Sequence, residues 1–142
     1  MANSLKERTV YRNIDISDIV TYRLPWAGWV SILHRISGAL LFLLLPFIVW
    51  LLDLSLSSEA SFDRFSSVFQ VGIGLLPAWF VKLVCLGLIW AYLQHFLAGL
   101  RHLWMDLTHK VSKEQGRVSA IITVALTLLL TLALGARLFG IY

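Results

Sequence analysis

Three long apolar stretches stand out in the pattern of hydrophobic and polar residues along this chain. Each is an interval without Asp, Glu, Lys or Arg, and they lie at 36–52, 83–100 and 118–136. A helix needs about 20 residues to cross the hydrocarbon layer of a bilayer, so each interval is long enough for one membrane span. With their flanking residues they predict an all-α fold with three transmembrane helices, at about 29–52, 77–103 and 118–138.

The composition also indicates an integral membrane protein and narrows what the chain can do. Of its 142 residues 58% are hydrophobic and 14% are charged, and the mean hydropathy is +0.79. We therefore treat residues 1–142 as a single membrane domain with no room for a soluble catalytic domain, which excludes most hydrolase and transferase chemistry. The lone Cys85 allows neither an internal disulfide nor a metal site built from cysteines.

The segments that connect the spans differ in charge. The amino-terminal tail and the second connection are rich in basic residues: Lys6, Arg8, Arg12, Arg23, Arg101, Lys110, Lys113 and Arg117. The first connection has only Arg64, on a short surface helix expected through 62–65. The positive-inside rule then places the amino terminus and the second connection in the cytoplasm, or in an organelle matrix. Because the basic residues flank spans in this way, we expect no nucleic-acid partner.

Two further features concern the shape and packing of the spans. Pro46 lies inside the first span, where we expect it to kink the helix without ending it. In the third span Ser119, Thr123, Thr127 and Thr131 recur at intervals of four residues. Small polar side chains in such a stripe are typical of a face that packs against another membrane helix.

Two histidines at the end of the second span are the first candidates for chemistry. His95, Gly99 and His102 fall on one helical face, with the histidines about 10 Å apart along the axis. An ionisable group within a membrane helix indicates function, and a neutral imidazole is a good ligand for iron. Gly99 would leave room for a large flat group. A buried histidine bonded to a neighbouring helix is an equally good interpretation of His95 from these residues alone.

The start of the first span carries a second polar group. Ser31 and Arg35 lie one turn apart, and His34 and Gly38 lie on an adjoining row. A hydroxyl and a guanidinium so placed can donate hydrogen bonds to oxygen atoms of a bound group, although Arg35 could simply be a flanking charge that sets topology. Asp106 could pair with Arg101 or with a partner subunit.

Together these residues resemble a known family, the cytochrome b subunit of succinate dehydrogenase, the larger membrane anchor of respiratory complex II. The similarity rests on residues 31–38, with the sequence SILHRISG, and on His95 followed by Gly99, Arg101, His102 and Asp106. It covers most of the chain from about Tyr22 to the end of the third span.

The resemblance implies a helical bundle with a second small anchor subunit, with which the chain shares haem b. It implies His95 as an axial ligand of the haem iron, His34 and Arg35 as residues near the propionates, and Ser31 and Arg35 as residues of the quinone site. The chain would dock the iron–sulfur and flavoprotein subunits, which hold the iron–sulfur clusters and FAD, on the cytoplasmic side. Ubiquinone, or menaquinone in some relatives, would be the electron acceptor.

The implied location is a bacterial inner membrane, with the mitochondrial inner membrane as the alternative. Other functions stay open: a haem-free membrane anchor, a quinol:fumarate reductase anchor, or a small helical transport protein. A reducible b-type spectrum separates a haem-binding subunit from a haem-free anchor or transporter.

The charge asymmetry generates a first prediction about topology. An alkaline phosphatase reporter fused after Tyr142 should be active outside the cytoplasm, because an odd number of spans separates it from an amino terminus held inside by Lys and Arg. The same reporter fused after Lys110 should be inactive. Activity after Lys110 combined with none after Tyr142 would show the opposite orientation.

Overall fold

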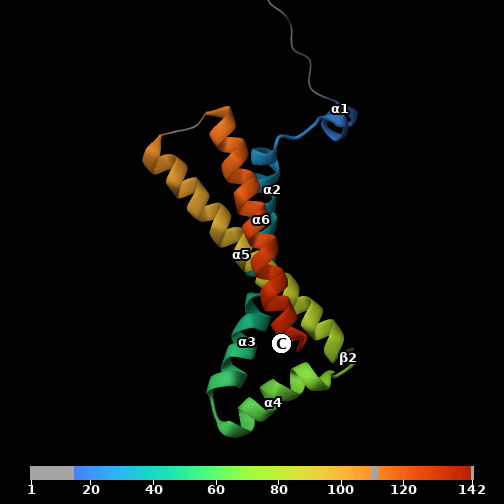
Figure 1. Cartoon of the computed structure of the whole chain (residues 1–142). Helices are drawn as coiled ribbons and strands as arrows, with labels where there is room; N and C mark the ends of the chain where they lie inside the picture. The colour runs from blue at the N-terminus through green and yellow to red at the C-terminus, as the bar shows by residue number, and fades with distance from the viewer. Residues whose placement is uncertain (1–14, 110–111, 142) are drawn as a thin grey trace, which may run out of the picture.

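The structure, a computed structural model, describes residues 15–109 and 112–141, and these are almost entirely helical (Figure 1). Within these ranges the elements, in chain order, are α1 (Ile16–Thr21), α2 (Trp26–Leu43), α3 (Leu45–Leu56), α4 (Glu59–Gln70), β1 (Gly72–Ile73), β2 (Leu76–Pro77), α5 (Ala78–Thr108) and α6 (Lys113–Leu138). The all-α prediction is confirmed, since the only strands in the described ranges are two of two residues each, which form a hairpin between α4 and α5. The basic residues Lys6, Arg8, Arg12 and Lys110, on which the predicted orientation partly rests, lie outside the described residues.

Three helices are long and apolar enough to cross a membrane. They are α2, α5 and α6, with mean hydropathies of 1.3, 1.7 and 2.3 over their most apolar windows. The last two extend beyond the apolar intervals: α5 continues to Thr108 and α6 begins at Lys113. Helix α5 is followed by His109, whose φ of 50° is left-handed. Helix α6 begins after Ser112, whose side chain accepts a hydrogen bond from the Gln115 N–H. Capping therefore sets these ends in the polar connection.

The first span is broken near its middle, where the sequence indicated one kinked helix over 29–52. Leu44 has φ −93° and ψ 4° and separates α2 from α3. Pro46 has no N–H to donate to the Phe42 carbonyl, and its ring crowds that carbonyl, so the helix cannot continue regularly through this turn. The Leu44 N–H still reaches the Leu40 carbonyl at 3.0 Å, and the Ile48 N–H reaches the Leu44 carbonyl at 3.0 Å. The expected kink is thus a one-residue interruption between two helices.

The region beyond the break packs loosely against the bundle. Helix α3 buries none of its residues and, within the described chain, contacts only α2 and α4. Helix α4 includes the surface helix expected at 62–65 and is longer, because Ser58 and Ser61 form a reciprocal capping box at its start. In Figure 1 α3 and α4 form a V at one end of the molecule, below the crossing of the long helices.

Small residues hold the three long helices together. Helix α5 packs against both α2 and α6, and Val30, Ala98 and Ala120 form a fully buried cluster with one residue from each helix. On α6, Thr123, Thr127 and Thr131 are buried along the predicted stripe, which confirms it as a packing face. Large apolar side chains instead cover the outside: Leu128, Leu129 and Leu132 are all exposed. Such an arrangement suits a bilayer, where close backbone approach rather than water exclusion drives association.

Candidate functional site

Three histidines meet where α2 lies against α5. The ring of His34, on α2, stacks on that of His95, on α5, with centroids 4.2 Å apart and planes 11° from parallel. The His102 ring lies on the other side of the cluster, 5.4 Å from His34 and tilted by 54°. The structure thus brings together His34 and His95, which the sequence singled out separately, and adds His102 beside them.

A reciprocal arrangement of histidine and glycine allows the two helices to come this close. Gly38 of α2 faces the His95 ring, and a Cβ atom placed on Gly38 would lie 2.8 Å from His95 Cε1. Gly99 of α5 faces His34, where a Cβ atom would lie 3.7 Å from His34 Nε2. The space that the sequence assigned to a large flat group at Gly99 therefore holds the His34 imidazole.

A hydrogen bond fixes the orientation of His95 and the position of its proton. His95 Nδ1 lies 3.0 Å from the backbone oxygen of His34, which also accepts a hydrogen bond of 2.9 Å from Ser37 Oγ. A carbonyl oxygen can only accept, so Nδ1 carries the hydrogen. His95 Nε2 has no hydrogen-bond partner in the described part of the chain. Metal-bound histidines usually donate their other N–H to such an oxygen, so this arrangement would suit a metal ligand.

Of the clustered histidines, only His95 has its ring oriented by a hydrogen bond in a way that suits a ligand of haem iron. His34 stacks parallel to His95, which is the wrong arrangement for two imidazoles on opposite sides of one iron. His102 lies about two turns further along α5. The described residues also contain no group of three or more His, Cys, Asp or Glu side chains able to hold a metal ion by themselves.

Ser31 and Arg35 lie on α2 with polar atoms free for an external ligand. Ser31 is partly buried and Arg35 is exposed. Neither side chain makes a hydrogen bond or an ion pair within the described residues, and neither takes part in the ring contacts of the histidine cluster. Both groups are therefore available to something outside the described chain.

Arg101 has a role that the sequence did not indicate. Its side chain is only 7% exposed and donates from Nε to Ser119 Oγ at 2.9 Å and from a terminal nitrogen to the Gly116 oxygen at 3.1 Å. Asp106 is exposed and makes no ion pair with it within the described residues, so the suggested pairing of Arg101 with Asp106 is not formed. Arg101 instead joins α5 to the first turns of α6. The one feature of the sequence that pointed to this contact was Ser119, the first residue of the polar stripe on α6.

Comparison with known proteins points to one group. Residues 8–134 match the family model of the succinate dehydrogenase/fumarate reductase transmembrane subunit. The chain is 37% identical over 103 residues to the succinate dehydrogenase cytochrome b556 subunit of Coxiella burnetii, an alignment that covers 72% of this chain and 78% of that protein. It is 33% identical over 104 residues to the subunit of the same name from Paracoccus denitrificans, covering 73% and 75%. The subunit of that name from Rickettsia felis is 26% identical over 113 residues, covering 80% and 82%.

The contact between Gly38 and His95 generates a prediction. Gly38→Ala should lower the thermal midpoint of the purified protein in its complex, because the new methyl group must displace a ring held by a hydrogen bond, at a cost of about 1–3 kcal/mol. Gly99→Ala is the matched control, since its methyl group would meet His34 at an ordinary contact distance, 3.7 Å. Equal midpoints for the two variants would show that the close contact at Gly38 does not limit stability.

Proposed function

Because the chain belongs to the succinate dehydrogenase/fumarate reductase transmembrane subunit family, we propose that it is a cytochrome b anchor subunit in which His95 Nε2 binds haem iron. The observation that carries this proposal is the 3.0 Å contact between His95 Nδ1 and the His34 oxygen. It sets the tautomer and aims the ring while leaving Nε2 without a partner in the described chain. When bound, a b-type haem supplies one-electron storage within the membrane.

The haem would be shared with a second small membrane anchor. His95 is the one histidine whose ring is oriented by a hydrogen bond within the described residues, so a second histidine ligand would come from the partner anchor. His34, stacked on the ligand, would hold the His95 ring in place from α2. Arg35, one residue further along α2, would offer a guanidinium to a haem propionate, for which its bidentate geometry is suited.

The quinone site would lie at the beginning of α2. A quinone is held by its carbonyl oxygens in an otherwise apolar cleft, so a few convergent donors suffice to bind it. Ser31 would donate its hydroxyl, and Arg35 would place a fixed positive charge where negative charge develops on reduction. Both side chains lack partners in the described chain, as donors awaiting a ligand should. Ubiquinone is the quinone we expect.

The remaining partners follow from the family and the predicted orientation. The basic ends of the spans would face the cytoplasm, and the iron–sulfur and flavoprotein subunits, which carry the clusters and FAD, would dock there. The relatives named above come from bacteria, which favours a bacterial inner membrane as the location. The family description also names fumarate reductase, so a quinol:fumarate reductase anchor is the alternative to test by the direction of turnover.

His95→Ala tests the ligand assignment. The variant complex should lose its haem or show a strongly altered reduced-minus-oxidised spectrum, because one iron ligand is removed without placing a new charge in the membrane. His109→Ala serves as the control, since His109 is exposed at the end of α5 and should leave the spectrum unchanged. An unaltered spectrum in His95→Ala would rule out ligation by this residue. A wild-type complex without a reducible b-type spectrum would identify a haem-free anchor.

Ser31→Ala and Arg35→Ala test the quinone assignment. Each should reduce succinate-to-quinone turnover by about a hundredfold or more, because a donor in a water-poor site typically contributes a few kcal/mol. Succinate oxidation by an artificial dye acceptor at the soluble subunits should survive. Arg64→Ala is the control for loss of a positive charge, since Arg64 is exposed on α4. If Arg35→Ala keeps normal quinone turnover, Arg35 serves topology and the site lies elsewhere.

A further inference from the structure

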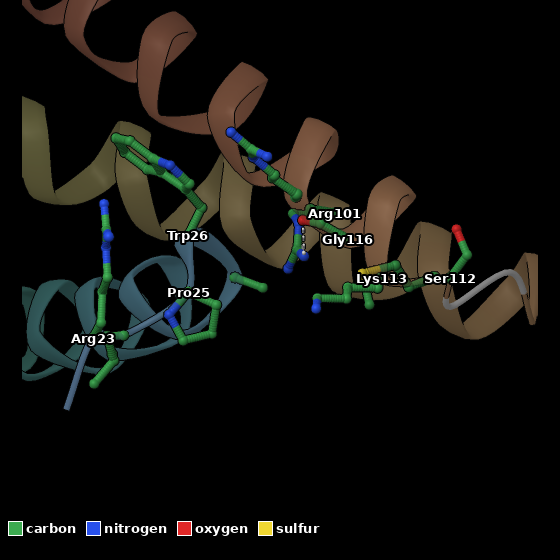
Figure 2. Close-up of a pocket in the computed structure, with 11 residues that line it drawn as sticks. Arg23, Pro25, Trp26, Arg101, Ser112, Lys113 and Gly116 are labelled. Carbon is green, nitrogen blue, oxygen red and sulfur yellow. Dashed lines mark hydrogen bonds between the residues drawn. The ribbon is translucent and has the colours of Figure 1, made fainter. Parts of the chain in front are cut away.

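A cavity lies away from the histidine cluster, among the ends of the three long helices. It has a volume of about 600 Å³ and is bounded by the segment that enters α2, the last turns of α5 and the first turns of α6. In Figure 2 Arg23 comes from the segment before α2, Trp26 from the first turn of α2, Arg101 from α5, and Ser112 and Lys113 from the start of α6. Ser31, Arg35 and His95 do not line it, so it is separate from the proposed haem and quinone positions.

The charge of this cavity is entirely of one sign. Arg23, Arg101, Lys113 and Arg117 line it, and no Asp or Glu does. None of these four forms an ion pair with a carboxylate within the described residues. The amino terminus of α6, at Lys113, adds the positive end of a helix dipole. Four basic residues gathered without an acidic partner favour an anion.

Arg101 is the residue that most needs an anion. It is 7% exposed, and its two described hydrogen bonds go to neutral acceptors, Ser119 Oγ and the Gly116 oxygen (Figure 2 shows the latter). A guanidinium has five N–H donors, so others are left over. Neutral acceptors do not balance a buried charge, and burying a cation without a counter-ion is costly. Since the described residues supply no carboxylate to Arg101, the counter-ion should come from outside the described part of the chain.

Part of the cavity wall is apolar, which narrows the kind of anion. Leu24, Pro25, Trp26 and Met105 line it beside the basic residues. Tryptophan at the end of a membrane span marks the headgroup layer, and the cavity lies at this level of all three spans. We propose that the cavity binds an anionic phospholipid, with its phosphate among the basic residues and its acyl chains against the apolar wall.

Two other occupants would use the same positive charge. Free inorganic phosphate would use the basic residues but leave the apolar wall uncovered. An acidic segment of a docked protein would approach from the aqueous side and have no need of Trp26 and Met105. An anionic lipid would contact both the basic and the apolar residues that line the cavity. This inference requires neither haem nor quinone to bind where we propose.

The test uses the purified complex that contains this chain, stripped of lipid in neutral detergent and titrated with phosphatidylglycerol or phosphatidylcholine. Native mass spectrometry reports lipids bound per complex. The variant Lys113→Gln/Arg117→Gln removes two exposed cations from the cavity, and Arg64→Gln/Arg137→Gln removes two exposed cations elsewhere with the same change in net charge. We expect the affinity for phosphatidylglycerol to fall about tenfold in the first variant and to stay unchanged in the control. Phosphatidylcholine should bind weakly to all three proteins.

Further measurements distinguish the alternatives. Arg101→Gln should also lose phosphatidylglycerol, but it removes the link to α6, so the exposed pair carries the test. Inorganic phosphate should fail to displace the lipid; displacement at concentrations that leave other bound lipids in place would identify a phosphate site and overturn the proposal. Equal phosphatidylglycerol binding in wild type and both double variants would also overturn it. So would unchanged lipid binding with loss of the soluble subunits in Lys113→Gln/Arg117→Gln, which would identify a protein partner.

Discussion

The hydrogen bond between His95 Nδ1 and the backbone oxygen of His34 is the contact on which the arrangement of this protein depends. It joins α5 to α2, fixes the tautomer of His95 and leaves Nε2 with its lone pair available. It can form only because the helices approach closely, and they do so because Gly38 offers no side chain to the His95 ring. The close packing of α2 against α5 and the orientation of His95, the proposed metal ligand, thus depend on the same contact. A change to one should also change the other.

A second link operates between α5 and α6 towards the polar ends of the spans. Arg101 donates hydrogen bonds to Ser119 and Gly116 of α6. Helix α5 is therefore bonded to α2 at His95 and to α6 at Arg101, six residues further along. In an apolar medium these polar contacts are valuable, because water is not there to replace them. The buried positive charge of Arg101 also makes this end of the bundle receptive to an anion, which connects the internal packing to the surrounding membrane.

The sequence was sufficient for the spans but not for the contacts between them. Intervals without charge predicted the three membrane helices, since hydrophobic length is a local property. The stripe on α6 was likewise predictable from its spacing. The stacking of His34 on His95, the pairing of each histidine with a glycine of the other helix and the partners of Arg101 depend on the register of one helix against another. Pro46 shows a further limit: its missing N–H was evident, but whether a helix bends or is interrupted depends on packing around it.

The interruption at Leu44 divides the first span into two helices that make different contacts. Helix α2 is held to α5 at the imidazoles, whereas α3 buries no residue and contacts only α2 and α4 in the described chain. A rotation of α3 about Leu44 therefore leaves the register of His34 and His95 unchanged. The contacts of the histidine cluster and the course of the chain beyond Leu44 therefore belong to separate stretches of the first span.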